Sequence, residues 1–276
     1  MRPASLPTYV SRILHYTNAE KSALATTAYK SLLKGKPLVS VVIPAYNEEL
    51  NVLNSVLSIS QNVTDYSVEI IVVNNNSTDR TQEVASATGV TCILETKKGV
   101  TNARTTGLIA AQGKYIINAD ADSIYPVGWI NEMITPLEHD EKVALAYSRF
   151  AFIPGESTSR FSYFLYENMA DSMRFVHRNF KEEAVNVYGC SSAFRKDQCL
   201  QVDAYDHPPG TGEDGWLALK LRNKGFGKLH YVPTMKALVW TVDRHIQEDG
   251  GLWKALFMRV KGAIFGHDPA KYHVKG

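Results

Sequence analysis

Short apolar runs alternate with stretches of helical periodicity along the middle of the chain. Four runs are rich in β-branched residues and bounded by turn residues, as strands are: VSVVIPAYN (39–47), EIIVVNNNSTD (69–79), VTCILET (90–96) and KYIINAD (114–120). Between them lie EELNVLNSVLSISQN, STDRTQEVASATG and GVTNARTTGLIAAQG, which are predicted to be helices. Strands that alternate with helices predict crossover units and a mainly parallel sheet flanked by helices, an α/β fold.

The flanking regions are less regular. Residues 1–36 are predicted to form a helical extension, in which Asn18 caps a helix that Gly35 and Pro37 end. After residue 126 come a helix (129–139), a strand (143–152) and a long aromatic helix (159–179). Because no linker separates the two halves, we expect one domain at 37–240, made of a regular half (37–126) and an elaborated half (127–240), followed by an amphipathic helical segment (241–276).

Composition narrows the class of protein. The chain has 276 residues, 45% hydrophobic and 21% charged, enough to fill a large core, and its net charge of +2 gives no reason to expect a nucleic-acid partner. Cys92, Cys190 and Cys199 lack the spacing of zinc ligands and are odd in number, which favours a reducing, cytoplasmic compartment. The N-terminus lacks the apolar core of a signal peptide, and no apolar run is long enough to span a membrane.

The first strand ends in Tyr46 and Glu48. An aromatic face and a carboxylate at the carboxyl end of a strand suit a nucleobase, which needs stacking and an acceptor for its ring N–H groups. The alternative is a turn made by Pro44 and Asn47, with Glu48 in the first turn of the next helix, where the helix dipole favours a carboxylate.

The next two strand ends are also polar. Three consecutive asparagines (74–76) can bind a base or ribose, although asparagines are common in turns for local reasons. Lys97, Lys98 and Arg104 surround Gly99 close to a helix start, which suits phosphate oxygens. A solvated basic face is the alternative.

The fourth strand runs into Asp120 and Asp122. In extended backbone residues i and i+2 point the same way, so the two carboxylates could converge on one point. A divalent cation neutralises such a pair, and Mg²⁺ or Mn²⁺ with a substrate diphosphate completing its shell is the natural occupant. A solvated turn is the alternative.

Glu213 and Asp214 precede an apolar helix. The surrounding GTGEDG matches the dinucleotide-binding G-x-G-x-x-G but follows His207 and two prolines rather than a strand, so we discount that match. A carboxylate here is either a helix cap or a general base aimed at an acceptor hydroxyl.

Together, VSVVIPAYNEE, EIIVVNNNSTDRT, KKGVTNARTTGLIAAQGKYIINADADS and GEDGWLALKLRNKGFG resemble family 2 glycosyltransferases, which have the GT-A fold and transfer a sugar from a nucleoside diphosphate. The likeness covers residues 39–230, so that 37–126 would bind the nucleotide and 127–240 the acceptor. The resemblance implies base contacts from Pro44, Tyr46 and Glu48, donor contacts from Asn75, Asp79, Lys98, Arg104 and Asp120, a divalent metal (Mn²⁺ or Mg²⁺) on Asp122 and Asp120, and a catalytic base at Asp214 partnered by Glu213.

The implied reaction is a single displacement with inversion, in which Asp214 takes a proton from the acceptor hydroxyl while the metal stabilises the departing diphosphate. Asn75 stands where many relatives have aspartate, so uracil is the expected base but not a fixed one. Gly215 and Trp216 replace the usual residues after the E-D pair, which leaves the wall of the acceptor site open to question. Without a Q-x-x-R-W motif we expect one sugar per encounter, in surface polysaccharide or glycoconjugate synthesis.

The C-terminal segment carries two further hypotheses. His245 is a third metal ligand, a phosphate contact or a structural histidine. The apolar arc between 252 and 265 either binds a membrane surface, favouring a lipid-linked acceptor at the inner face of the membrane, or packs on its own domain.

Two other functions compete with glycosyl transfer. A sugar-1-phosphate nucleotidyltransferase is disfavoured because no glycine-rich phosphate loop follows the first strand. The other is a catalytically silent protein of the same fold that binds nucleotide or carbohydrate.

Overall fold

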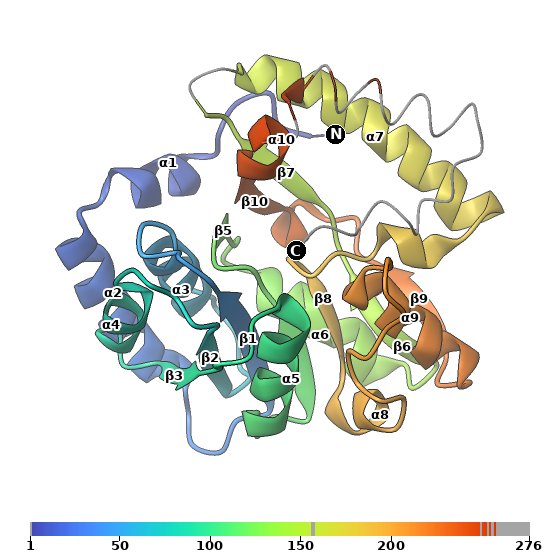
Figure 1. Ribbon diagram of the computed structural model, residues 1–276, viewed down its shortest axis with the longest axis horizontal. Helices are drawn as coiled ribbons and strands as arrows, with labels where there is room; N and C mark the ends of the chain where they lie inside the picture. The colour runs from blue at the N-terminus through green and yellow to red at the C-terminus, as the bar shows by residue number, and fades with distance from the viewer. Residues whose placement is uncertain (1, 156–157, 249, 253, 255–256, 258–276) are drawn as a thin grey trace.

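A seven-stranded sheet in the order β3-β2-β1-β4-β8-β6-β9 forms the centre of the molecule (Figure 1). The computed structural model describes residues 2–155, 158–248, 250–252, 254 and 257. The strands of this sheet are β1 (Val39–Ala45), β2 (Val68–Asn74), β3 (Thr91–Leu94), β4 (Tyr115–Asn118), β6 (Val143–Tyr147), β8 (Ser192–Arg195) and β9 (Lys228–Tyr231). Strand β8 is antiparallel to β4 and β6, and the other pairings are parallel. The mainly parallel sheet predicted from the sequence is confirmed.

Helices cover both faces of this sheet. They are α1 (Thr8–His15), α2 (Asn18–Leu32), α3 (Val52–Ser60), α4 (Thr81–Ser86), α5 (Val100–Ala110), α6 (Trp129–His139), α8 (Lys196–Leu200) and α9 (Glu213–Asn223). Alternate residues of β1 show the division, because Val41 and Ile43 join the core built with α2, α3 and α6, whereas Val42 joins the core built with α5 and α9. The period of two along a strand thus produces three layers, helix on sheet on helix.

A second, three-stranded sheet lies beside the first, in the order β5-β10-β7. Its strands are β5 (Ser123–Ile124), β7 (Phe150–Ile153) and β10 (Val239–Val242), followed by α10 (Arg244–Glu248). The long helix α7 (Arg160–Phe180) packs on β7, and a short 3₁₀ helix, η1 (Glu183–Asn186), follows it. Within the described ranges, no helix is both long and apolar enough to cross a bilayer.

Two local predictions need correction. The run at 143–152 was expected to be one strand, but Ser148 and Arg149 separate β6 from β7, which belong to different sheets. The run divides because β6 pairs with β8 and β9, whereas β7 pairs with β10. The cap of α2 is Thr17 rather than Asn18, since the Thr17 hydroxyl and the Glu20 carboxylate each bind the other's backbone N–H in a capping box.

Candidate active site

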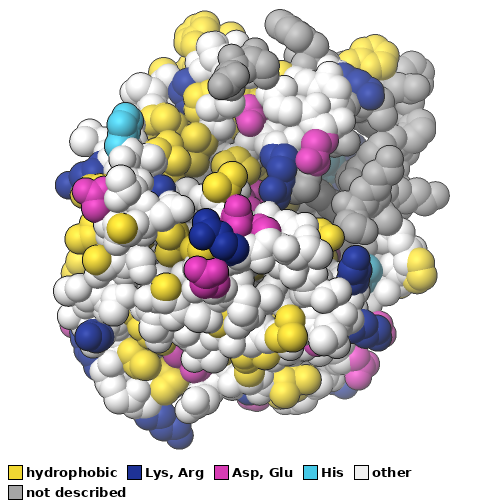
Figure 2. All heavy atoms as spheres, turned by 60° about the vertical axis from the view of Figure 1, so that its left-hand side comes forward, with side chains coloured by type: hydrophobic (Ala, Val, Ile, Leu, Met, Phe, Trp, Pro, Cys, Tyr) yellow, Lys and Arg dark blue, Asp and Glu magenta, His cyan; other side chains and the backbone are white. Residues whose placement is uncertain are grey.

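The predicted polar clusters share one edge of the main sheet. Strands β2 and β4 both pair in parallel with β1, with Ala45 opposite Asn74 and Val42 opposite Asn118. The carboxyl ends of these strands therefore lie together, and the side chains that follow them are neighbours. Acidic and basic side chains also adjoin near the middle of the face shown in Figure 2.

Arg104 connects the two carboxylate motifs. Its guanidinium lies 3.1 Å from Oδ1 of Asp120, 3.3 Å from Oε1 of Glu213 and 3.7 Å from Oδ1 of Asp214. The side chain is only 2% exposed, and its Nη1 is buried without a hydrogen-bond partner. Burial lowers the pKa of Arg104, but the three carboxylates outweigh burial and raise it. Helix α5 thus brings together two motifs that lie more than 90 residues apart in the chain.

Asp214 lies at the start of α9 in a largely buried position. Its Oδ1 accepts a hydrogen bond from Nδ2 of Asn118 at 3.3 Å, and the Asn118 oxygen accepts one from the Tyr205 hydroxyl at 2.6 Å. Burial raises the pKa of Asp214 most, Arg104 lowers it, and Glu213 and Asp120 raise it further, for a clear net increase. A carboxyl group whose pKa is raised towards neutrality is suited to accept a proton.

Sequence reasoning missed Asn118 and Gly189 around Asp214. A Cβ atom on Gly189 would lie 1.9 Å from Nη2 of Arg104 and 2.5 Å from Oδ2 of Asp214, so only glycine fits beside this ion pair. Asn118 could have been found as the polar residue that ends the apolar run YIIN. Gly189 carries no comparable signal, because its neighbours in space are distant in sequence.

The chain turns between Asp120 and Asp122. Residues 121–122 form a turn, so the extended backbone that would align the two side chains does not continue through the motif. Asp120 faces Arg104, whereas Asp122 lies near Thr241 and Arg244, with Nη2 of Arg244 3.6 Å from its Oδ2. The side chain of Asp120 is 36% exposed and that of Asp122 is 11% exposed.

Glu48 is tied to the C-terminal part of the chain. Its Oε1 lies 2.6 Å from Nη2 of Arg244, and its Oε2 accepts a hydrogen bond from Nδ2 of Asn51 at 2.8 Å. The Glu48 side chain is buried, so in this structure both carboxylate oxygens are engaged by the protein itself. Arg244 therefore bridges Glu48 and Asp122, the ends of two different motifs.

Asn75 and Asp79 are likewise engaged within the protein. The Asn75 amide donates to the carbonyl of Lys97 at 2.8 Å and accepts from the N–H of Gly99 at 2.8 Å, which fixes the loop before α5. Asp79 accepts from the backbone N–H groups of Thr81 and Glu49. Burial raises the pKa of Asp79, but the hydrogen bonds from Thr81 and Glu49 lower it by more.

Tyr46 and Lys98 leave an open surface at the same edge. The Tyr46 ring is 49% exposed, and the Lys98 ammonium lies 5.9 Å from its centroid. Pro44 is half-buried in β1 two residues earlier. Of the residues expected to meet the donor, this aromatic and basic pair has the most accessible functional groups.

The third metal ligand expected from the sequence cannot be placed. The backbone of His245 belongs to α10, and its side chain lies outside the described part of the structure. Among the described residues, no group of three His, Cys, Asp or Glu side chains is arranged to hold a metal ion.

The fold is that of an α/β protein with polar and charged side chains gathered at the carboxyl ends of its parallel strands, and comparison with known proteins identifies the family. The model of glycosyl transferase family 2 matches residues 40–200, more than half of the chain. The chain therefore belongs to glycosyl transferase family 2.

Curated relatives are similar over parts of their length. A probable glycosyltransferase of Bacillus subtilis, YdaM, is 26% identical over 242 residues, which cover 82% of this chain and 55% of the relative. An uncharacterised glycosyltransferase of Haemophilus influenzae is 37% identical over 113 residues, 39% of this chain and 35% of the relative. The chain thus spans between a third and about half of the length of these relatives.

Solved structures share the fold. The mannosyltransferase PcManGT from Pyrobaculum calidifontis, in complex with GDP-Man and Mn²⁺, has a TM-score of 0.56 at 18% identity, covering 96% of this chain and 79% of its own. The glucosyl-3-phosphoglycerate synthase of Mycobacterium tuberculosis, with Mn²⁺, UDP and phosphoglyceric acid, has a TM-score of 0.54 at 21% identity, covering 90% and 82%. At these identities the likeness establishes the GT-A fold, as the sequence predicted.

Proposed function

We propose that this chain transfers a sugar from a nucleoside-diphosphate donor to an acceptor hydroxyl, with inversion and one sugar per encounter. The observation that carries the proposal is the contact of Arg104 with Asp120, Glu213 and Asp214. This contact supports the proposal because Asp120 belongs to the motif expected to meet the donor diphosphate and Asp214 is the carboxylate expected to act as base. An in-line displacement needs these two groups on opposite sides of one anomeric carbon.

Asp214 is the proposed catalytic base and Glu213 its partner. The hydrogen bond from Asn118 holds the Asp214 carboxylate in place, and Arg104 stabilises its ionised form. In the reaction the carboxylate takes the proton of the acceptor hydroxyl as the new glycosidic bond forms. Arg104, whose Nη1 has no acceptor among the described residues, is the proposed contact to an oxygen of the donor diphosphate.

Asp122 and Asp120 are the proposed ligands of Mg²⁺ or Mn²⁺. Their carboxylate oxygens fit a hard divalent cation, and two protein ligands leave positions for water and diphosphate oxygens. The bound metal would neutralise charge on the departing diphosphate. Arg244 already supplies a positive charge next to Asp122, which fits a site built for an anionic leaving group. His245 stays a proposed third ligand.

For the base we propose stacking on Tyr46, with Pro44 and Lys98 beside it and uracil as the occupant. Glu48, Asn75 and Asp79 then shape the base site through the loops they fix. The structural neighbours bind different bases, since one was crystallised with UDP and another with GDP-Man. The Asn75 amide is therefore the natural position at which to test base preference.

We assign the transferase domain to residues 37–240, with the nucleotide half at 37–126 and the acceptor half at 127–240. Leu252, at the start of the predicted amphipathic arc, is buried with Phe152, Tyr163, Tyr166 and Ile246. That contact supports packing of this position on the domain. Peripheral attachment of the remaining arc to the inner face of the membrane, with a lipid-linked acceptor, stays a proposal; Phe257 of this arc is exposed, and most of the arc lies outside the described residues.

Donor turnover with Mn²⁺ or Mg²⁺ tests the proposed function. Across a panel of nucleotide sugars, Asp214→Asn should lower kcat by about 100- to 10,000-fold, as expected for loss of a general base. Asp122→Ala should abolish the metal-dependent thermal stabilisation of the protein by UDP. Asp65→Asn, at an exposed aspartate, is the matched control. Wild-type rates in both site variants would disprove the mechanism, and binding without turnover would favour a silent binding protein.

A further inference from the structure

A second group of arginines surrounds a cavity next to the active site. The cavity has a volume of about 200 Å³ and lies at the ends of β6 and β9, beneath α7. Arg149, Arg174 and Arg178 line it, together with Tyr147, Asn186 and Tyr231. Ligand pockets for whole drug-sized molecules measure roughly 300–1,000 Å³, so this one suits a single functional group and its nearest atoms.

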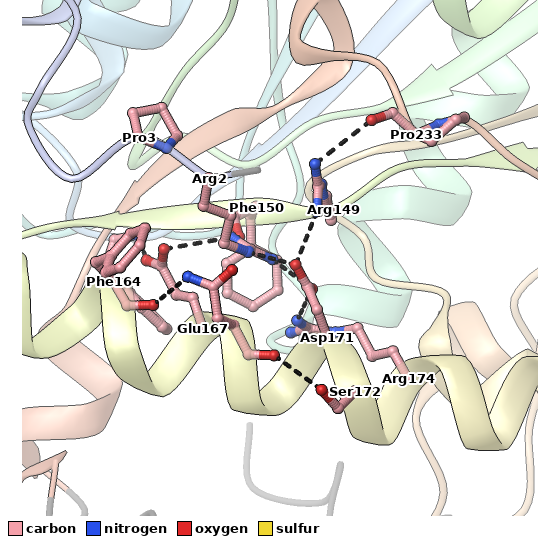
Figure 3. Close-up of polar contacts among 12 residues, drawn as sticks. Arg2, Pro3, Arg149, Phe150, Phe164, Glu167, Asp171, Ser172, Arg174 and Pro233 are labelled. Atoms are coloured by element: carbon pink, nitrogen blue, oxygen red, sulfur yellow. Dashed lines mark hydrogen bonds and ion pairs between the residues drawn. The ribbon is translucent and has the colours of Figure 1, made fainter.

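The charge around the cavity is strongly positive. The Asp171 carboxylate accepts hydrogen bonds from three guanidinium groups, as Figure 3 shows. The nitrogen–oxygen distances are 2.7 Å to Arg2, 2.7 Å to Arg149 and 2.9 Å to Arg174. Among the described residues, five arginines (2, 149, 160, 174 and 178) face three carboxylates (167, 171 and 183) in and around the cavity, an excess of two positive charges. One carboxylate shared by three guanidinium groups leaves donors for another anion.

Several of these donors lack an acceptor. The Nε atoms of Arg149 and Arg174 are buried and have no hydrogen-bond partner among the residues that the structure describes. Arg178 lies against the rings of Tyr231, at 4.3 Å, and Phe175, at 5.8 Å, and forms no ion pair within the described part of the chain. Buried donors without acceptors are costly, so the wall of this cavity holds more guanidinium donors than its own acceptors satisfy.

The cavity lies close to Asp214. Ser192 pairs with both Tyr147 and Asn118, and neighbouring strands are about 4.8 Å apart, so Tyr147 lies roughly 10 Å from the residue that holds Asp214. The chain sets an upper limit, because only two residues separate Asn186 in the cavity wall from Gly189 against Asp214, a span of at most roughly 10 Å. That separation matches the length of a small acceptor molecule.

We propose that the arginine-lined cavity binds an anionic group, a phosphate or a carboxylate, carried by the acceptor whose hydroxyl reaches Asp214. The proposal rests on the transferase function proposed above. Arg178 contacts the anion together with Arg149 and Arg174, which line the same cavity, and the hydroxyl of the same molecule lies at the base. Acceptor choice then depends on a charge bound outside the reaction centre.

The site is tested by measuring how much inorganic phosphate, and separately acetate, raises the melting temperature of the full chain. UDP and Mg²⁺ are present in every sample, and chloride at the same ionic strength is the salt control. The wild type should be stabilised by at least one of the two anions. Arg178→Gln should weaken that binding about ten- to a hundred-fold, the effect of one charge-assisted hydrogen bond, and Arg178→Lys should weaken it less. Arg178 has no ion pair to lose, so this variant should fold. Arg12→Gln, at an exposed arginine of α1, should bind as the wild type does.

The outcomes separate this proposal from the function on which it rests. Equal anion binding by Arg178→Gln and Arg12→Gln would overturn the site. If phosphate binding depends on Arg178 but neutral acceptors are used as well as phosphorylated or carboxylated ones, the assignment to the acceptor is wrong. Failure of UDP and Mg²⁺ to stabilise the wild type would count against the transferase function alone. A preference for anionic acceptors that falls in Arg178→Gln would support both.

Discussion

Gly189 sets how closely the chain can approach the ion pair of Arg104 and Asp214. Because glycine has no side chain, Nη2 of Arg104 can lie where it does; a Cβ atom at this position would be only 1.9 Å from it. Gly189→Ala should therefore displace the guanidinium, which is buried and cannot swing into solvent, and should lower kcat/KM about 100-fold. Steady-state transfer assays measure this effect.

The matched control is Gly128→Ala. There the new Cβ would lie 3.4 Å from Cδ of Lys236, a flexible side chain, and the backbone φ of −99° is open to alanine. This variant should retain full activity. Equal rates for the two variants would show that the pair tolerates displacement, and that Gly189 has no role in placing the base.

The pKa of Asp214 predicts how activity depends on pH. Burial raises this pKa and Glu213 raises it further, so the ionised base should form only above the usual pH range of an aspartate. The value of kcat/KM should accordingly rise with pH across its acidic limb. Glu213→Gln removes a neighbouring negative charge and should move that limb to lower pH.

The pH profiles of kcat/KM for the wild type and Glu213→Gln, at saturating Mg²⁺, provide the measurement. A limb that stays in place, or moves to higher pH, would contradict the assignment of Asp214 as base. Asp65→Asn serves as the control for loss of a carboxylate outside the site, and its limb should coincide with that of the wild type.

At this scale the sequence predicted which residues meet at the edge of the sheet, but not how they pair. Asp120 and Asp214 were expected at strand and helix ends, and the structure joins them through Arg104. Glu48 and Asn75 have the expected chemistry, yet their polar atoms bind Arg244 and the loop before α5. Arg244 lies 196 residues from Glu48, and local patterns carry no information about contacts over that separation.

Helix α5 shows how an element can be predicted while its placement is not. Its expected range, 99–113, contains the observed Val100–Ala110. A Cβ on Gly107 would lie 2.3 Å from Cγ1 of Val42, so this glycine lets α5 lie closely against β1. Arg104 lies one turn earlier on the same helix, and the close packing of α5 brings it next to Asp120 and Asp214. A glycine inside a helical pattern was the available signal for this close contact.

The second half of the chain was harder to predict because its strands are short and pair out of sequence order. The four strands predicted in the first half correspond to β1 to β4, whereas the two-residue β5 was not predicted. Strand β8 has only four residues and inserts between β4 and β6, and the run at 143–152 divides between two sheets. Whether such short segments form strands depends on the strands they pair with more than on their local periodicity.

At the scale of the whole molecule, the N-terminal extension is fastened to α7. Arg2 binds both oxygens of Asp171, at 2.7 and 2.8 Å, and its guanidinium also reaches the carbonyl of Phe150 (Figure 3). Helix α1 adds Val10 and Ile13 to the main core, and α2 adds Tyr29. The extension therefore packs on both the first half of the domain and the helix that covers the arginine-lined cavity.

This contact predicts a stability effect that depends on pH. Arg2→Gln should lower the free energy of unfolding by about 2 to 3 kcal/mol at neutral pH, because it removes charged hydrogen bonds from a buried position. The arginines hold the pKa of Asp171 at about 2, below its unfolded value, although burial opposes them. A lowered pKa contributes stability above the unfolded value, near 3.9, and that contribution is lost as pH falls towards 2.

Denaturant unfolding of the wild type and Arg2→Gln, from pH 7 down to pH 2, should thus show a difference that is constant above about pH 5 and shrinks below pH 4. Arg12→Gln should follow the wild type throughout, because this arginine is exposed on α1. A difference that stays constant to pH 2 would mean that Arg2 stabilises the fold through its contact with the carbonyl of Phe150 rather than through Asp171. In that case the N-terminal extension would be held by backbone contacts, and the Arg2–Asp171 ion pair would contribute little to stability.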